Sequence, residues 1–236
     1  MAGCIAAGCL IANSVHAQQA SENPSPALQS QDGSFHRSWQ LGGFAAGGFP
    51  PSYEIHSAAL HYGIELDLLN AGIEAGRLQA RTHGSGMLRG RGEAAIEVIP
   101  FWLAHYPLQT RIIYYTSGLT PPTPSSFGPY NIHGASVTPV LLRWNFMRQD
   151  ASRFVPWAQL GGGLLWTNHK FPLLGESTSV INFTPQIGMG QSVFLKKNRS
   201  LDFAMKAVHI SNAGLGDHNP GLNVTLQFSA GFSWWK

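Results

Sequence analysis

His209 and Ser211 place a general base and a potential nucleophile two residues apart. In an extended strand successive side chains point to opposite faces, so these two share one face. The residues that precede them on that face are all apolar: Leu201, Phe203, Met205 and Ala207. Asp202 and Lys206 fall on the opposite face. A polar pair at the end of an apolar stripe suits an enzyme that attacks lipid from the outside of a membrane barrel.

The chemistry that this pair could perform is ester acyl transfer. A serine hydroxyl is a weak nucleophile until a neighbouring base takes its proton, so His209 would act as general base and Ser211 as nucleophile. The spacing alone also suits a simpler role, in which both side chains contact lipid head groups at the rim of a barrel. Neither role needs a metal, and the other histidines show no metal-ligand spacing: His105, His133, His169 and His218.

The N-terminal residues indicate export. Residues 1–17 have an apolar centre and end in Val15-His16-Ala17, which fits the small-residue rule for signal-peptide cleavage. We expect a signal peptide at 1–17, a polar linker at 18–39 and a barrel domain at 40–236. Both cysteines, Cys4 and Cys9, lie in the leader, so the mature chain would form no disulfide. A lipoprotein attached through Cys9 is a weaker alternative, because the residues before it lack the usual large aliphatic side chain.

Composition indicates that something other than water covers much of the surface. Charged residues are 11% of the chain, against roughly 25% in ordinary soluble domains. After the leader, no uncharged segment has the uninterrupted apolar length of a membrane helix. The net charge of +3 is spread along the chain, which argues against a nucleic-acid partner.

A two-residue alternation of apolar and polar side chains recurs along the chain and predicts strands with one oily and one polar face. Between 222 and 234, for example, Leu222, Val224 and Leu226 alternate with Thr225 and Gln227. We predict eight strands: 40–49, 71–82, 91–105, 133–147, 153–167, 178–195, 200–211 and 222–235. The predicted fold class is all-β, an eight-stranded antiparallel transmembrane β-barrel.

The connections between these strands alternate in length. If the N-terminus is periplasmic, the inward connections at 83–90, 148–152 and 196–199 are short, and those at 50–70, 106–132 and 168–177 are long. This parity is typical of outer-membrane barrels and predicts an outer-membrane location. The seventh strand then runs outward and brings His209 and Ser211 to the outer-leaflet boundary.

Eight strands enclose side chains rather than a wide pore. We therefore expect the charged residues of the polar faces to form a buried structural network: Glu93, Glu97, Arg143 and Lys206. At the other boundary, Trp234 and Trp235 are expected in the inner interfacial girdle.

The segment around His209 resembles a known family. His209-Ile210-Ser211-Asn212-Ala213, followed by Asn219-Pro220-Gly221-Leu222-Asn223, is similar to the signature of the outer-membrane lipid A 3-O-deacylase family, also described as acyloxyacyl-hydrolase-like. The similarity extends through Leu88-Arg89-Gly90, Glu97-Val98-Ile99-Pro100, Arg143-Trp144-Asn145-Phe146 and Asn182-Phe183. It implies a barrel that hydrolyses the ester-linked acyl chain at the 3 position of lipid A without a cofactor. The implied partners are lipid A or lipopolysaccharide and the outer membrane.

The resemblance also implies roles for the residues after Ser211. The backbone N–H near Gly214 and the side-chain amide of Asn219 would stabilise the oxyanion, and Asn212 would hold the loop. Some family members have Glu where this chain has Asn223, whose carbonyl could still orient His209 but could not supply a negative charge. Alternation alone puts Asn223 on the polar face of its strand, so it would need a bulge or loop position to reach His209. Asp217 is the alternative orienting residue.

Two functions from different classes follow from these observations. The first is a lipid A esterase, and the second is a noncatalytic small barrel with a structural or adhesive role. The sequence leaves the oligomeric state open, including a homodimer.

Overall fold

The computed structural model describes residues 38–51, 54–56, 61–63, 65–113, 121, 123–147, 153–173, 178–214 and 222–236. The expected signal peptide and nearly all of the expected linker lie outside these residues, as do Asp217 and Asn219. In the described part of the chain, the structure contains no helix with the length and apolar character needed to cross a membrane.

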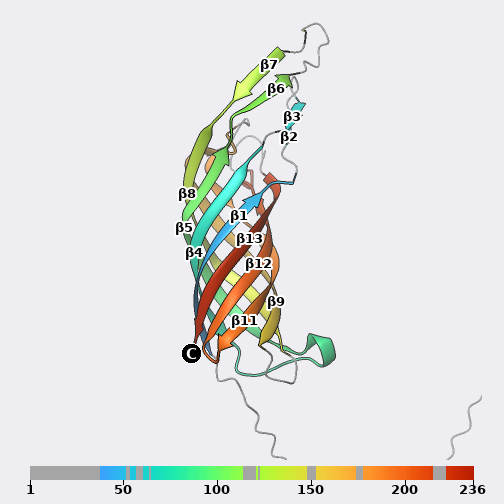
Figure 1. Cartoon of the computed structure of the whole chain (residues 1–236), viewed down its shortest axis with the longest axis vertical. Coiled ribbons are helices and arrows are strands. Elements are labelled where there is room, and N and C mark those ends of the chain that lie inside the picture. The colour runs from blue at the N-terminus through green and yellow to red at the C-terminus, as the bar shows by residue number, and fades with distance from the viewer. Residues whose placement is uncertain are drawn as a thin grey trace, which may run out of the picture. The chain divides into compact units, whose positions relative to one another are not determined.

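Eight antiparallel strands form one closed sheet (Figure 1). They are β1 (Trp39–Phe49), β4 (Asp67–Leu78), β5 (Gly90–Tyr106), β8 (Tyr130–Phe146), β9 (Phe154–Phe171), the broken strand β10 (Ser179–Phe183) plus β11 (Gln186–Lys196), β12 (Arg199–Ile210) and β13 (Leu222–Trp235). Strands β1 and β13 pair antiparallel from Gln40↔Trp235 to Phe49↔Leu226 and so close the sheet. The predicted eight-stranded barrel is confirmed.

Two predicted strands differ in detail from the structure. The second strand, predicted at 71–82, spans Asp67–Leu78. The prediction was displaced because the outward face of this strand starts and ends with charged residues, Asp67 and Arg77, which hide the alternation. The sixth is interrupted after Phe183, where Pro185 has no N–H to donate to a neighbouring strand. This interruption lies beside β12 and contributes to the site described below.

The long connections lie at one end of the barrel and the short ones at the other (Figure 1). The first two long connections contain hairpins of their own, β2 (Glu54–His56) with β3 (His61–Gly63) and β6 (Gln109–Ile113) with β7 (Thr123–Phe127). At the opposite end, η1 (Gly86–Leu88) lies between β4 and β5, and β11 and β12 are joined directly across Lys197 and Asn198. Short turns mark the periplasmic end of an outer-membrane barrel.

Side chains alternate between the outer wall and the lumen along each strand. On β12, Leu201, Phe203 and Met205 are exposed on the outer wall, while Ser200, Lys206 and Val208 are buried. Exposed large apolar side chains occur on all eight strands, as a surface in contact with hydrocarbon requires.

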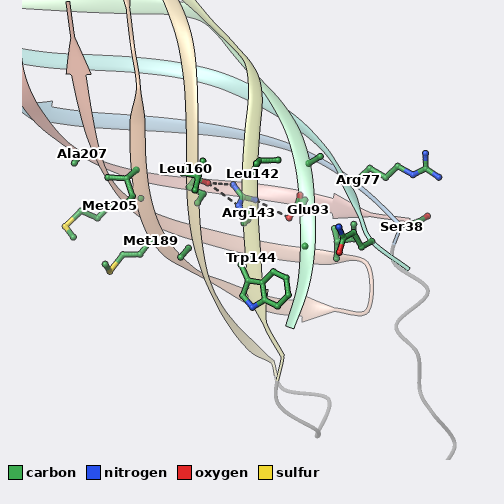
Figure 2. A pocket seen from close by; sticks show the side chains of 18 of the residues that line it. Ser38, Arg77, Glu93, Leu142, Arg143, Trp144, Leu160, Met189, Met205 and Ala207 are labelled. Atoms are coloured by element: carbon green, nitrogen blue, oxygen red, sulfur yellow. Dashed lines mark hydrogen bonds and ion pairs between the residues drawn. The ribbon is translucent and has the colours of Figure 1, made fainter. Parts of the chain in front are cut away.

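The lumen contains the predicted charged network, and it is buried. The Arg143 guanidinium lies 2.7 Å from Glu74 and 3.7 Å from Glu93, and it stacks 4.3 Å from the ring centroid of Trp157. Figure 2 shows Arg143 and Glu93 directed inward, whereas Met189 and Met205 point away from the barrel. Glu74 was missed in the sequence because the alternation of its strand is poor.

A second ion pair lies in the lumen between Lys206 and Glu97. Gln186 donates from Nε2 to the other Glu97 carboxylate oxygen at 3.2 Å and to Thr138 Oγ1 at 3.1 Å. Because Lys206 and Glu97 are 7% and 2% exposed, each charge depends on the other for compensation.

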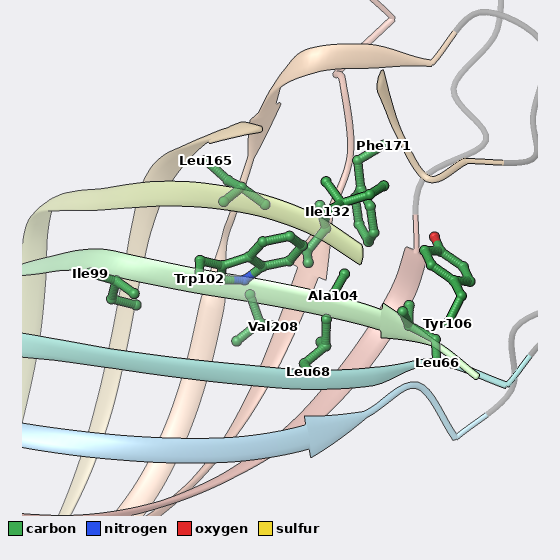
Figure 3. Packing of buried hydrophobic residues seen from close by; sticks show 11 residues of the cluster. Leu66, Leu68, Ile99, Trp102, Ala104, Tyr106, Ile132, Leu165, Phe171 and Val208 are labelled. Atoms are coloured by element: carbon green, nitrogen blue, oxygen red, sulfur yellow. The ribbon is translucent and has the colours of Figure 1, made fainter. Parts of the chain in front are cut away.

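Apolar clusters lie in the lumen on both sides of this polar layer. Towards the end with the long connections, Trp102 packs edge-on against Phe171 at 5.1 Å, in a cluster with Ile132, Leu165 and Ile210 (Figure 3). At the other end the cluster comprises Leu78, Val155, Phe194 and Trp235. Two cavities between the lumen side chains have volumes of only about 40 and 20 Å³. The expectation of a filled interior is therefore confirmed.

The expectation for the two C-terminal tryptophans is wrong for one of them. Trp234 is 51% exposed on the outer wall, but Trp235 is 6% exposed inside the barrel, where Nε1 donates to Ser200 Oγ at 2.9 Å. Adjacent residues of a strand face opposite sides, so both could not join the same girdle.

The buried ion pair gives a testable prediction about stability. Replacing Lys206 by Met, or Glu97 by Gln, leaves the other member of the pair unpaired in the lumen and should lower the free energy of unfolding by about 3–5 kcal/mol. The double variant Lys206→Met/Glu97→Gln should lose less than the sum of the two single changes. Urea unfolding of the barrel in phosphatidylcholine vesicles measures all four proteins. Additive losses would show that the two residues do not stabilise each other.

Candidate functional site

His209 lies on the outer wall near the end of β12, at the end of the barrel that carries the long connections. The side chain is half-buried and follows Met205 and Ala207 on the same face, whereas Asp202 and Lys206 face the lumen. The predicted apolar stripe leading to His209 is thus confirmed. The backbone N–H of His209 donates to the carbonyl oxygen of Pro185 at 3.0 Å, where the sixth strand is interrupted.

Ser211 follows the last residue of β12 and is held by β10. The Ser211 N–H donates to Phe183 O at 3.1 Å, and the Phe183 N–H donates to Ser211 O at 2.6 Å. Residues paired in this way share a face of the sheet, and Phe183 is 37% exposed on the outer wall. Ser211 is therefore on the same side of the sheet as His209, yet only 5% exposed.

The pairing of β12 with β13 contains an irregularity beside His209. Val208 pairs with Thr225, but Ile210 pairs with Leu222, so Asn223 and Val224 both stand opposite the single residue His209. This is the two-against-one arrangement of a β-bulge, which interrupts the alternation of the bulged strand. The sequence indicated that Asn223 would need such a bulge to reach His209.

Thr225 anchors the regular side of this bulge. Its Oγ1 donates to Val208 O at 3.0 Å, and the side chain is completely buried. The Thr225 hydroxyl thus holds the peptide that leads directly into His209. Sequence analysis placed Thr225 on the polar face of its strand but gave it no role at the site.

A tight turn follows Ser211. Ala213 and Gly214 have φ values of 52° and 77°, in the left-handed region that favours glycine. The Asn212 side chain, 2% exposed, accepts the Gly214 N–H at Oδ1 over 3.0 Å. The Ala213 N–H donates to Ser211 Oγ at 3.4 Å. The turn therefore directs one backbone donor at the Ser211 hydroxyl, while a second donor is held by Asn212.

The predicted site residues are thus brought together to different extents. His209, Ser211 and Gly214 lie on one continuous segment at the end of β12, and the backbone of Asn223 stands opposite His209. Below His209 on the outer wall, Met205 and Ala207 of β12 form an apolar surface with Met189, which pairs with Met205 from β11. The charged residues of the lumen face away from this site.

The chain belongs to the lipid A 3-O-deacylase (PagL) family, whose model matches residues 93–233. Comparison with curated protein sequences gives no significant match. Among solved structures, the chain is similar to the outer-membrane enzyme PagL, with 16% identity, coverage of 81% of this chain and 97% of the other, and a TM-score of 0.40. It is also similar to Neisserial surface protein A, with 14% identity, coverage of 83% of this chain and 96% of the other, and a TM-score of 0.46. For OprG from Pseudomonas aeruginosa the identity is 12%, the coverage is 85% of this chain and 96% of the other, and the TM-score is 0.44. Family membership supports an outer-membrane location and hydrolase activity.

The contact between Thr225 and Val208 gives a prediction about the support of the site. Thr225→Val keeps the shape of the side chain but removes the hydroxyl donor, so it should lower the free energy of unfolding by about 1 kcal/mol. Thr225→Ser keeps the donor and serves as the matched control, with a smaller loss. Urea unfolding measures both. Equal stability of Thr225→Val and the wild type would show that the hydrogen bond does not hold this peptide.

Proposed function

We propose that this protein is an outer-membrane esterase that hydrolyses the ester-linked acyl chain at the 3 position of lipid A, with His209 as general base and Ser211 as nucleophile. The observation that carries the proposal is the position of these two residues within a chain of the lipid A 3-O-deacylase family. They lie on the outer wall, at the end of an apolar stripe and beside the long connections.

The position of the site suits a lipid ester. In a bilayer the ester group lies between the polar head and the hydrocarbon chains, and a position at the end of the apolar stripe would bring His209 to that boundary. The acyl chain would extend along the lipid-facing side chains below His209, among them Ala207 and Met205. The sugar to which it is esterified would remain above, at the level of the long connections.

The proposed reaction has two steps. His209 takes the proton of Ser211 as Oγ attacks the ester carbonyl, and the tetrahedral intermediate collapses to an acyl-serine as His209 returns the proton to the departing sugar hydroxyl. Water, activated by His209, then attacks the acyl-serine and releases the fatty acid. Both Ser211 and His209 are regenerated.

The turn after Ser211 supplies candidate oxyanion donors. The Ala213 N–H already points at Ser211 Oγ. The Gly214 N–H is bonded to the Asn212 amide oxygen, a neutral acceptor, and a negatively charged oxyanion would be the stronger acceptor for it. The proposed donors to the oxyanion are therefore the backbone N–H groups of Ala213 and Gly214 and the side-chain amide of Asn219.

Asn223 is the proposed orienting residue for His209. The bulge that sets Asn223 opposite His209 supports this assignment, since a regular strand would keep alternation through this position. A carboxamide oxygen can accept the imidazole N–H and select its tautomer, although it cannot balance the charge of an imidazolium. Asp217 is the alternative orienting residue.

Substitution of the two proposed catalytic residues should abolish most of the activity. Ser211→Ala and His209→Ala should each lower turnover of purified lipid A by several orders of magnitude, and the double variant should be little worse than either, because the residues act as one unit. Mass spectrometry of the product should show the loss of one hydroxyacyl chain with wild-type protein only. An unchanged shift between heated and unheated samples on a denaturing gel controls for folding.

Two outcomes would overturn the proposal. Wild-type barrel that folds but releases no fatty acid would favour the alternative, a noncatalytic barrel with a structural or adhesive role. Substantial turnover by Ser211→Ala would show that another group is the nucleophile.

A second prediction tests Asn223. If it orients His209, Asn223→Ala should reduce turnover about tenfold or more, whereas Asn223→Glu should keep or raise it by adding a negative charge beside the imidazolium. The matched control is Asn131→Ala, which removes an outward-facing asparagine at the same end of the barrel, on β8. Equal turnover of wild type, Asn223→Ala and Asn223→Glu would exclude Asn223 and direct attention to Asp217.

A further inference from the structure

The end of the barrel with the short turns has a strongly basic rim. Eight cationic side chains make up this basic rim: Arg77, Arg81, Arg89, Arg153, Lys196, Lys197, Arg199 and Lys236. All are exposed except Arg89, which is half-buried. In the described residues of this end, the only carboxylates of Asp and Glu side chains are those that face the lumen.

The opposite end has the reverse balance. Of the Lys and Arg residues whose side chains the structure describes, only Lys170 lies there, together with Glu65 and Asp67. Among the described side chains, positive charge is therefore concentrated at the end with the short turns.

The arginines of the basic rim are placed on the wall of the barrel as well as in its turns. Arg77 pairs across strands with Trp39, and its guanidinium carbon lies 5.5 Å from the centroid of that ring. Arg199 pairs in the same way with Trp234. Trp39 and Trp234 are 53% and 51% exposed on the outer wall. Exposed tryptophans mark the boundary between hydrocarbon and head groups, so these two arginines stand at the level of lipid phosphates.

Four arginines of the basic rim have no carboxylate partner among the described residues. Within the described part of the chain, Arg77, Arg81, Arg153 and Arg199 form no ion pair with a carboxylate, in contrast to Arg143 and Lys206 of the lumen. Arg153 instead donates from Nε to the carbonyl oxygen of Phe194 at 3.3 Å. Its remaining N–H groups can meet an external acceptor.

We propose that the basic rim is a binding surface for anionic phospholipids of the inner leaflet, such as phosphatidylglycerol. Cations at a membrane surface attract anionic head groups, and the planar guanidinium binds phosphate oxygens in pairs. Pairing with lipid-facing tryptophans favours a lipid over a soluble polyanion, because it places Arg77 and Arg199 beside the bilayer rather than below it. The esterase site lies at the other end of β12, so this surface is independent of the proposed catalysis.

The test compares lipid association in one bilayer. The full-length barrel is reconstituted in phosphatidylcholine containing a trace of spin-labelled phosphatidylglycerol or spin-labelled phosphatidylcholine, and the motionally restricted fraction gives their relative association constant. We expect a several-fold preference for phosphatidylglycerol that weakens between 0.01 and 1 M salt, as the Debye length falls from about 30 to about 3 Å. The double variant Arg77→Gln/Arg199→Gln should remove most of this preference, because one cation at a membrane surface contributes as much as about fivefold.

Matched single variants locate the effect. Arg77→Gln and Lys170→Gln each remove one cation, from opposite ends of the barrel, and only the first should reduce the preference. The gel shift between heated and unheated samples confirms that each variant is folded. No preference in the wild type, or an equal loss in Lys170→Gln, would overturn the proposal. Loss of binding to isolated peptidoglycan in Arg77→Gln/Arg199→Gln, with the lipid preference unchanged, would assign the surface to a periplasmic polymer instead.

Discussion

A strand in hydrocarbon finds no water for its N–H and C=O groups, so every strand of the barrel needs a partner on both sides. The pairing of β1 with β13 meets this requirement and closes the sheet. Closure then divides each strand into a lipid-facing and a lumen-facing set of side chains, because consecutive residues alternate. The apolar stripe of β12 and the buried charges of the lumen both follow from this division.

The lumen is too narrow to leave its charges in water, so they compensate one another. Arg143 lies between Glu74 and Glu93, and Lys206 pairs with Glu97, between apolar clusters at both ends. Such pairs are costly to break by removing one member, which makes the interior a rigid support rather than a reaction chamber. The proposed chemistry lies instead on the outer wall, where a lipid can approach from the bilayer.

Two local departures from regular pairing shape the proposed site. At the break between β10 and β11, the carbonyl of Pro185 accepts the backbone N–H of His209. Next to it, β10 holds Ser211 through paired backbone hydrogen bonds. On the other side, the bulge in β13 sets two residues against His209. Bulges at the rim of a barrel redirect side chains, and here the redirected position is the one proposed to orient the base.

The sequence by itself determined the eight strands, the filled lumen and the face that carries His209, because alternation with a period of two is a local property of each strand. It failed where the local pattern was ambiguous or interrupted. The predicted bounds of β4 were displaced by four residues, Glu74 was not recognised as part of the buried network, and Trp235 was assigned to the wrong face. Only the tertiary structure showed that Pro185 and Phe183 hold β12, that a bulge faces His209, and that Arg77 and Arg199 each pair with a tryptophan. These depend on the register between strands distant in sequence, which no single strand encodes.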